Sequence, residues 1–172
     1  MFIDPMHFST FLYKTYAERI RGTSQADNLT GTNESDRITS SGGNDVLVGL
    51  GGDDIVDGGR GNDTLSGSED NDYLFASGDN DVVRGDEGND ELEGENGDDD
   101  ISGGIGDDTL VAGLGDDILN GNEGNDNLFG GPGNDTLSGG PGIDYFDCGL
   151  NSGRILDFNV AEGDARSISC RD

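Results

Sequence analysis

Aspartate recurs at every ninth residue over most of this chain. Such carboxylates could ligate a hard cation or take part in acid–base chemistry. The unchanging spacing marks a repeated structural unit, and the fold of that unit decides where the carboxylates lie. Fourteen of them follow one another without a slip, at Asp27, Asp36, Asp45, Asp54, Asp63, Asp72, Asp81, Asp90, Asp99, Asp108, Asp117, Asp126, Asp135 and Asp144.

A large apolar side chain follows two residues after each aspartate. Counted from Gly22, the nine-residue unit has aspartate at position six and the apolar residue at position eight. Positions one to six are rich in Gly, Asn and Asp, which is typical of tight turns. Positions seven to nine alternate polar, apolar and polar, which is typical of a short strand with one buried face. The apolar residues are Leu29, Ile38, Leu47, Val56, Leu65, Leu74, Val83, Leu92, Ile101, Leu110, Leu119, Leu128, Leu137 and Phe146.

A turn followed by a three-residue strand predicts a chain that winds as a flattened coil. Two repeats, or eighteen residues, close one circuit, so strands two repeats apart lie side by side and parallel. The position-eight residues then pack between the two walls. We therefore expect an all-β fold, a right-handed parallel β-roll (a β-helix-like solenoid) in which the fourteen repeats make about seven two-strand circuits.

In such a coil the turns stack along two edges. Carboxylates eighteen residues apart, such as Asp45 and Asp63, become neighbours and would raise each other's pKa unless a cation lay between them. Calcium suits the place better than magnesium, because it accepts six to eight oxygen ligands, including backbone carbonyls, in flexible geometry. Fourteen turns contain twelve such pairs, so we expect up to about twelve Ca2+ ions between them.

The unit resembles the glycine-rich nonapeptide repeat of the RTX family, Gly-Gly-x-Gly-x-Asp-x-(apolar)-x. The resemblance covers residues 22–147 and is clearest in residues 58–66 and 130–138. It implies a calcium-binding parallel β-roll, in which position-six aspartates of adjacent turns on one edge bind calcium together with loop carbonyls. It also implies secretion by a route that needs no cleaved N-terminal signal, which fits a start without a basic region and a clean apolar stretch.

The copies differ in their turns. Position one is Gly except at Ser40, Ala76 and Ala112. If position four needs a positive φ, the turns that hold Asp27, Asp36, Asp72 and Asp81 are strained or reshaped, and we expect the run from Asp90 to Asp135 to bind best. Those four turns have Gln25, Glu34, Asp70 and Asp79 at position four, and the last copy has Ile143 at position five.

The two ends carry no repeat and are expected to cap the roll. In residues 1–21, Asp4 and Pro5 can start an amphipathic helix that Gly22 ends, with a membrane- or partner-binding helix as the alternative. Residues 148–172 include a strand-like stretch, 154–158, and the only two cysteines. A disulfide between Cys148 and Cys170 is the simplest pairing, and two reduced thiols are the alternative.

The formal net charge of −28 indicates a chain that repels itself and folds poorly without counterions. We expect calcium to fold it, and a disordered acidic tail is the alternative. Nucleic acid is an unsuitable partner for so acidic a surface. The flanks are too short for a catalytic domain, His7 is the single histidine, and the N-terminal segment is too short and polar to span a bilayer, so we expect neither an enzyme nor a transmembrane segment.

Three functions compete to explain these features. The first is an extracellular calcium-binding structural module. The second is a calcium-dependent subunit of a filament or an adhesive cell-surface protein, for which Tyr73, Phe75, Phe129 and Tyr145 on one outer wall would form the contact surface. The third is ice binding, which the irregular residues at position three argue against. The tail of a secreted enzyme is a further possibility that this chain does not decide.

Overall fold

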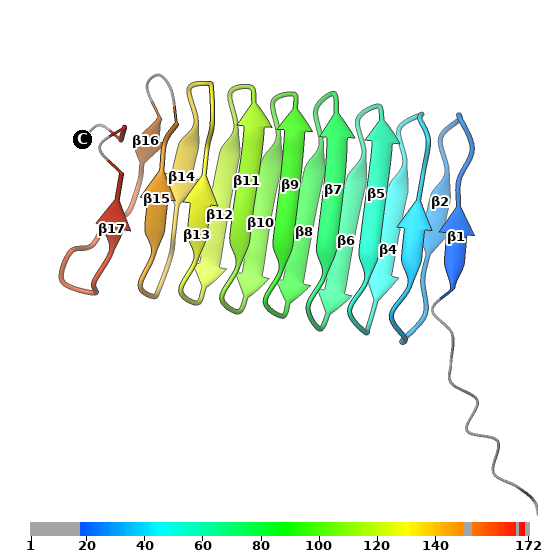
Figure 1. The fold of residues 1–172 in the computed structure, drawn as a ribbon, viewed down its shortest axis with the longest axis horizontal. Helices are drawn as coiled ribbons and strands as arrows, with labels where there is room; N and C mark the ends of the chain where they lie inside the picture. The colour runs from blue at the N-terminus through cyan, green and yellow to red at the C-terminus, as the bar shows by residue number, and fades with distance from the viewer. Residues whose placement is uncertain (1–17, 150–152, 168, 171–172) are drawn as a thin grey trace, which may run out of the picture.

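Seventeen short strands and the turns between them make up the part of the chain that the structure describes (Figure 1). The computed structural model describes residues 18–149, 153–167 and 169–170. One sheet has nine strands: β1 (Arg19–Arg21), β3 (Arg37–Thr39), β5 (Ile55–Arg60), β7 (Tyr73–Gly78), β9 (Glu91–Asn96), β11 (Thr109–Leu114), β13 (Asn127–Phe129), β15 (Tyr145–Asp147) and β17 (Ala165–Arg166). The other has eight: β2 (Asn28–Thr30), β4 (Val46–Leu50), β6 (Thr64–Glu69), β8 (Val82–Glu87), β10 (Asp100–Ile105), β12 (Ile118–Glu123), β14 (Thr136–Ser138) and β16 (Arg154–Ile155).

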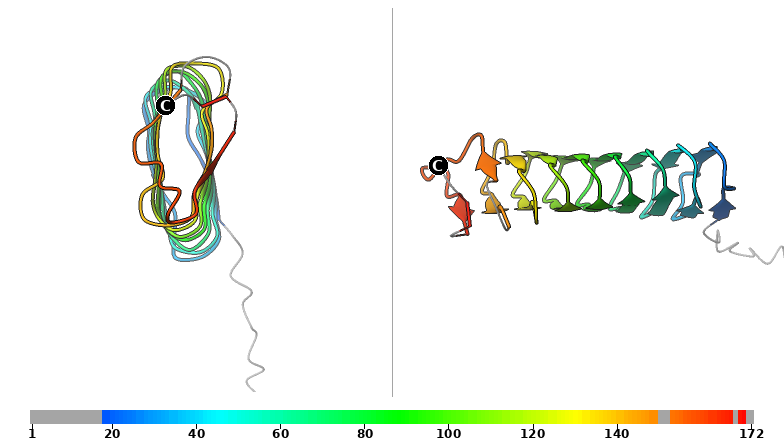
Figure 2. Two further views of the ribbon diagram at one scale, coloured as in Figure 1. Left: turned by 90° about the vertical axis from the view of Figure 1, so that its left-hand side faces the viewer. Right: turned by 90° about the horizontal axis from the view of Figure 1, so that it is seen from above.

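The strands pair in parallel with a register of eighteen residues over the repeats. In one sheet Leu110 lies beside Leu92, and in the other Ile101 lies beside Val83. Consecutive strands alternate between the two sheets, so the chain winds as a flattened coil, which appears end-on as a narrow ring in Figure 2. The prediction of an all-β parallel β-roll is confirmed. Seventeen strands at two per circuit make about eight circuits where the fourteen repeats predicted about seven, because β1, β16 and β17 extend both sheets.

The core lies between the two sheets and consists mainly of the position-eight side chains. From Ile38 to Phe146 all thirteen of these residues are fully buried. The central strands are longer than predicted, with six residues in β5 to β12, because they continue through positions one to three of the next repeat. Position one also faces inward, as the fully buried Ala76 and Ala112 show. Glycine or another small residue at that position lets the two sheets approach.

The prediction of an N-terminal helix is wrong for residues 18–21, the part of it that the structure describes. Residues 1–17, including Asp4, Pro5 and His7, lie outside the described residues. Of the predicted helix, Arg19–Arg21 forms strand β1, and the described part of the chain contains no helix. The physical reason is that Ile20 lies nine residues before Leu29 and packs against the core, so the strand period continues into this segment. No helix in the described ranges is therefore long and apolar enough to cross a bilayer.

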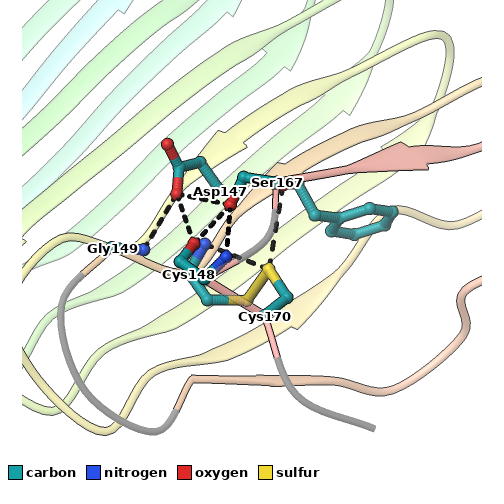
Figure 3. Close-up of a disulfide and its surroundings, with 7 residues drawn as sticks. Asp147, Cys148, Gly149, Ser167 and Cys170 are labelled. Carbon is teal, nitrogen blue, oxygen red and sulfur yellow. Dashed lines mark hydrogen bonds between the residues drawn. A yellow bond between two sulfur atoms is a disulfide. The ribbon is translucent and has the colours of Figure 1, made fainter.

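The C-terminal segment closes the other end of the core. A disulfide joins Cys148 to Cys170, and both cysteines belong to the core cluster (Figure 3). Beside it, the Asp147 carboxylate accepts hydrogen bonds from the Ser167 hydroxyl at 2.8 Å and the Gly149 amide at 3.0 Å. The strand expected over residues 154–158 is shorter than predicted and comprises only Arg154–Ile155.

Candidate metal centre

The fourteen aspartates lie in two columns, one along each edge of the roll. Thirteen of them are at most 3 % exposed, and Asp27 is half-buried. The upper edge, at the top of Figure 1, carries the turns that lead from the nine-stranded to the eight-stranded sheet, with Asp27, Asp45, Asp63, Asp81, Asp99, Asp117 and Asp135. The lower edge carries the returning turns, with Asp36, Asp54, Asp72, Asp90, Asp108, Asp126 and Asp144.

Hydrogen bonds join each column from end to end. The backbone amide of each aspartate donates to Oδ1 of the aspartate eighteen residues later, for example Asp90 to Asp108 at 2.8 Å. Twelve such bonds, 2.7 to 3.2 Å long, join the fourteen residues, so the expected pairs of neighbours are all present. One carboxylate oxygen of each later partner is therefore satisfied by the backbone.

The second carboxylate oxygen has no partner in most turns. Eleven Oδ2 atoms are buried without a hydrogen bond, those of Asp54, Asp63, Asp72, Asp81, Asp90, Asp99, Asp108, Asp117, Asp126, Asp135 and Asp144. Buried polar atoms in folded proteins almost always have a partner, and an unpaired buried charge is costly. Eleven repetitions of the same unsatisfied atom therefore point to a cationic group that belongs in these turns.

The first three turns satisfy that oxygen with the protein's own hydroxyl groups. The amide and hydroxyl of Thr23 donate to Asp27 Oδ2 at 2.6 and 2.9 Å, and Thr32 makes the same two bonds to Asp36. The hydroxyl of Ser40 donates to Asp45 Oδ2. These turns carry no free carboxylate oxygen, so the fourteen aspartates fall into a group of three and a group of eleven.

Burial raises the pKa of every aspartate in the group of eleven, by unequal amounts along the two columns. The pKa of Asp72, Asp81 and Asp108 rises to about 7, because burial disfavours the charged form. The amide of the preceding aspartate in the column opposes the shift, whereas neighbouring carboxylates add to it. The pKa rises to about 6 in Asp54, Asp63, Asp90, Asp117 and Asp126, and is also raised in Asp99, Asp135 and Asp144.

The free oxygen faces the α carbon of position one in its own turn. A Cβ added to Gly85 would overlap Asp90 Oδ2 and would also lie 2.6 Å from the carbonyl oxygen of Gly103, one circuit further on. Glycine therefore leaves open a cradle lined by a carboxylate and a carbonyl oxygen, two of the ligand types that calcium prefers. Among the described residues no three His, Cys, Asp or Glu side chains are grouped to hold a metal ion, so backbone oxygens would have to complete the coordination.

Two of the four irregular turns keep the common backbone shape. At position four Asp70 and Asp79 adopt φ values of 73° and 78°, in the left-handed region that aspartate tolerates better than most residues. Asp72 and Asp81 accordingly have the same free oxygens as their neighbours. The expectation that Asp70 and Asp79 reshape these two turns is therefore wrong. Gln25 and Glu34 do not adopt a positive φ, and their turns are two of those that use a threonine hydroxyl.

Two acidic residues beyond the fourteen belong to the lower-edge column. Glu18 stands nine residues before Asp27, and its amide donates to Asp36 Oδ1 at 2.7 Å. Asp164 accepts from the Asp144 amide at 3.1 Å, although it comes twenty residues later. Extending the nine-residue frame backwards would have found Glu18. The two extra residues before Asp164 break the period, and no signal in the spacing marks that residue.

A second ladder stands beside the aspartates at position five and uses only protein atoms. There the side-chain oxygen accepts a hydrogen bond from the backbone amide eighteen residues later, as Asp107 does from the Asn125 amide at 2.8 Å. Asn89 does the same for the Asp107 amide, also at 2.8 Å. Asparagine and aspartate are therefore interchangeable in this role, which separates position five from position six.

The chain matches one family of known proteins. The family model for the RTX calcium-binding nonapeptide repeat (4 copies) matches residues 15–47, 30–65, 48–83, 75–119 and 111–146. These overlapping matches run from residue 15 to residue 146 and include the turn of Glu18. A search of curated proteins found no match.

Proposed function

Because the chain belongs to the RTX calcium-binding nonapeptide repeat family, we propose that it is an extracellular structural module that folds when its stacked turns bind several Ca2+ ions. The repeat family supports a calcium-binding structural module. The fourteen position-six aspartates would be the ligands, and the eleven with a free oxygen would as a group bind more strongly than the three whose Oδ2 atoms accept hydroxyl hydrogen bonds.

The observation that carries this proposal is the buried, unpaired Oδ2 atom that recurs in eleven turns. A bound cation would supply the missing partner and remove the repulsion between carboxylates in one column. Calcium fits the donor set because it accepts carboxylate and carbonyl oxygens in flexible numbers, whereas magnesium demands strict octahedral geometry and keeps its waters. Calcium would supply positive charge and no reaction chemistry, so the proposed role is structural.

Coupling of binding to folding follows from the charge of the chain. Eleven divalent ions would bring the formal net charge from −28 to −6. At neutral pH and without these ions, the eleven buried carboxylates must either take up protons at a cost in free energy or remain charged and unpaired, and both states weaken the fold. Since the sites exist only in the folded coil, the free energy of binding also stabilises folding.

Two features favour a setting outside the cell. Extracellular modules bind calcium with dissociation constants of roughly 0.1 to 1 mM, a range that suits millimolar external calcium. The disulfide between Cys148 and Cys170 also fits an oxidising compartment.

A calcium titration of the metal-free protein tests the proposal. Circular dichroism and light scattering would be followed together, with magnesium at equal concentration as the control. We expect calcium to produce β signal at constant particle size and magnesium to produce much less. No change at millimolar calcium would refute calcium-driven folding.

The second candidate is a calcium-dependent filament or adhesive subunit. It is favoured by two aromatic pairs on the outer face of the nine-stranded sheet, Tyr73 with Phe75 at a ring distance of 4.6 Å and Phe129 with Tyr145 at 5.9 Å. All four side chains remain partly exposed. Growth of the scattering signal together with the β signal in the same titration would favour this candidate.

A further inference from the structure

The two edges of the roll differ at position one, the position beside the Oδ2 atom of the aspartate in the same turn. On the lower edge this position is glycine in all seven repeats. On the upper edge glycine alternates with a larger residue, so that every second turn carries a side chain there. The upper-edge residues are Gly22, Ser40, Gly58, Ala76, Gly94, Ala112 and Gly130, and the lower-edge residues are Gly31, Gly49, Gly67, Gly85, Gly103, Gly121 and Gly139.

The position of the free oxygen also differs between the edges. In the upper-edge turns of Gly58 and Gly130, an added Cβ would lie 2.7 and 2.5 Å from Oδ2 of the aspartate in the same turn. In the lower-edge turns of Gly49, Gly67 and Gly85 it would lie closer to that oxygen. From Asp54 to Asp144 the carboxylates of the lower edge therefore lie closer to position one than those in the glycine turns of the upper edge, whereas in the turn of Gly31 the distance from an added Cβ to Asp36 Oδ2 is 2.8 Å.

Alanine fills the cradle that glycine leaves open. Ala76 and Ala112 carry a real Cβ at this place and are fully buried, and the Oδ2 atoms of Asp81 and Asp117 in the same turns have no hydrogen bond. At Ser40 the side chain both fills the cradle and donates to Asp45. Because calcium–oxygen distances are held to about 2.3 to 2.6 Å, the volume of one methyl group is large on the scale of the site.

We propose that the two edges bind calcium unequally: the all-glycine lower edge forms the stronger column, and the side chains at Ser40, Ala76 and Ala112 weaken every second site on the upper edge. This inference rests on the proposed calcium-binding function. It makes the residue at position one, beside the aspartate at position six, a determinant of calcium affinity in this chain. The roll then has a calcium load smaller than its fourteen aspartates suggest.

Opening the filled cradles tests the inference in the full-length protein. In the double variant Ala76→Gly/Ala112→Gly, we expect each opened site to bind calcium at least about five-fold more tightly, equivalent to about 1 kcal/mol per site, and the calcium concentration at the folding midpoint to fall. Equilibrium dialysis near the wild-type midpoint should find about two more bound ions, one for each opened cradle. The lower-edge double variant Gly67→Ala/Gly103→Ala is the matched control and should show a higher midpoint and fewer bound ions.

The sign of the first result separates this inference from a purely structural role. Replacing alanine by glycine increases the conformational entropy of the unfolded chain, so a structural role alone predicts a higher midpoint. A midpoint that stays the same or rises in Ala76→Gly/Ala112→Gly, with an unchanged count of bound ions, would overturn the inference while leaving calcium binding intact. The absence of calcium uptake by the wild-type protein would instead refute the proposed function itself.

Discussion

At the level of single residues, Asp108 shows why these turns need a cation. Its Oδ1 atom accepts the amide of Asp90 at 2.8 Å, whereas its Oδ2 atom is buried without a partner. Its neighbour Asp107 makes the position-five hydrogen bond and is exposed. Two adjacent aspartates thus have opposite environments, and only the buried one has an unmet need for positive charge.

The variant Asp108→Asn should distinguish a calcium ligand at position six from a hydrogen-bond acceptor at position five. We expect the calcium affinity at this turn to fall by about tenfold and the calcium concentration at the folding midpoint to rise, because one charged ligand is lost. Without calcium the same variant should be slightly more stable than the wild type, since a buried charge is removed. The matched control Asp107→Asn should change neither value appreciably, because asparagine already occupies position five in other turns. Equal effects of the two substitutions on the midpoint would contradict this assignment.

The raised pKa values predict an unusual dependence of folding on pH. Burial raises the pKa of Asp72, Asp81 and Asp108 to about 7, from 3.8. A carboxyl group whose pKa is higher in the fold than in the unfolded chain favours folding below about pH 4, and this contribution is lost as the pH rises through 6 to 7. Metal-free protein should therefore gain β signal in circular dichroism on acidification from pH 8 to pH 4. With calcium the dependence should reverse, because protons compete for the ligands. A metal-free signal that is flat or falls on acidification would count against these shifts.

At the level of the strands, each six-residue element faces the core with its position-eight side chain and with a glycine or alanine at position one, and presents the rest to the surface. Strand β10 illustrates the contrast, since Ile101 is fully buried between the sheets and Ile105 is 55 % exposed near the turn. Both are isoleucines on one six-residue strand, so they form a natural pair of test and control.

Truncation of Ile101 and of Ile105 to alanine should lower the free energy of unfolding by very different amounts. We expect Ile101→Ala to lower the free energy of unfolding of the calcium-loaded protein by about 2 to 5 kcal/mol, because it leaves a cavity between the sheets. Ile105→Ala should change it by less than about 0.5 kcal/mol. Chemical denaturation in saturating calcium measures both. Similar losses for the two variants would show that the inward and outward faces are assigned wrongly.

The disulfide is the expected source of stability at the C-terminal end. It closes a loop of 22 residues in sequence separation, and such a loop stabilises a fold by about 3 kcal/mol. The double variant Cys148→Ser/Cys170→Ser should lose about that much free energy of unfolding in calcium. A reductant should destabilise the wild type and leave the variant unchanged. If the reductant has no effect on the wild type, the bond does not secure this end of the core.

Much of this architecture follows from the period of the sequence. The aspartates at position six and the apolar residues at position eight predicted both the eighteen-residue register and the two columns of carboxylates. The same reasoning failed where the period is disguised. Residues 19–21 were predicted to be the end of a helix because Glu18 replaces aspartate in the turn before them. Asp164 was not predicted as part of the column because two extra residues before it break the nine-residue period. Thr23 and Thr32 stand nine residues apart at position two, so their hydroxyl bonds follow the period, whereas Ser40 makes its bond from position one.

At the level of the whole molecule, charge and shape are coupled through the two columns. The chain has 37 acidic and nine basic residues, and thirteen of the acidic side chains are buried along the two edges. A long coil of this kind has a core only one side chain thick on each wall, so each circuit depends on its neighbours. Neutralising the columns should therefore act on the entire roll, and unequal edges would load at different calcium concentrations within one molecule.

Anomalous X-ray diffraction from crystals grown in calcium tests the central claim most directly. Calcium in the turns predicts two rows of anomalous peaks, spaced by about 4.8 Å along the roll, beside the aspartates from Asp54 to Asp144. The hydroxyl-bonded turns of Asp27, Asp36 and Asp45 should show the weakest peaks. A folded roll with no peaks along either edge, or with calcium only on the outer faces of the sheets, would contradict the claim that these carboxylates hold the metal.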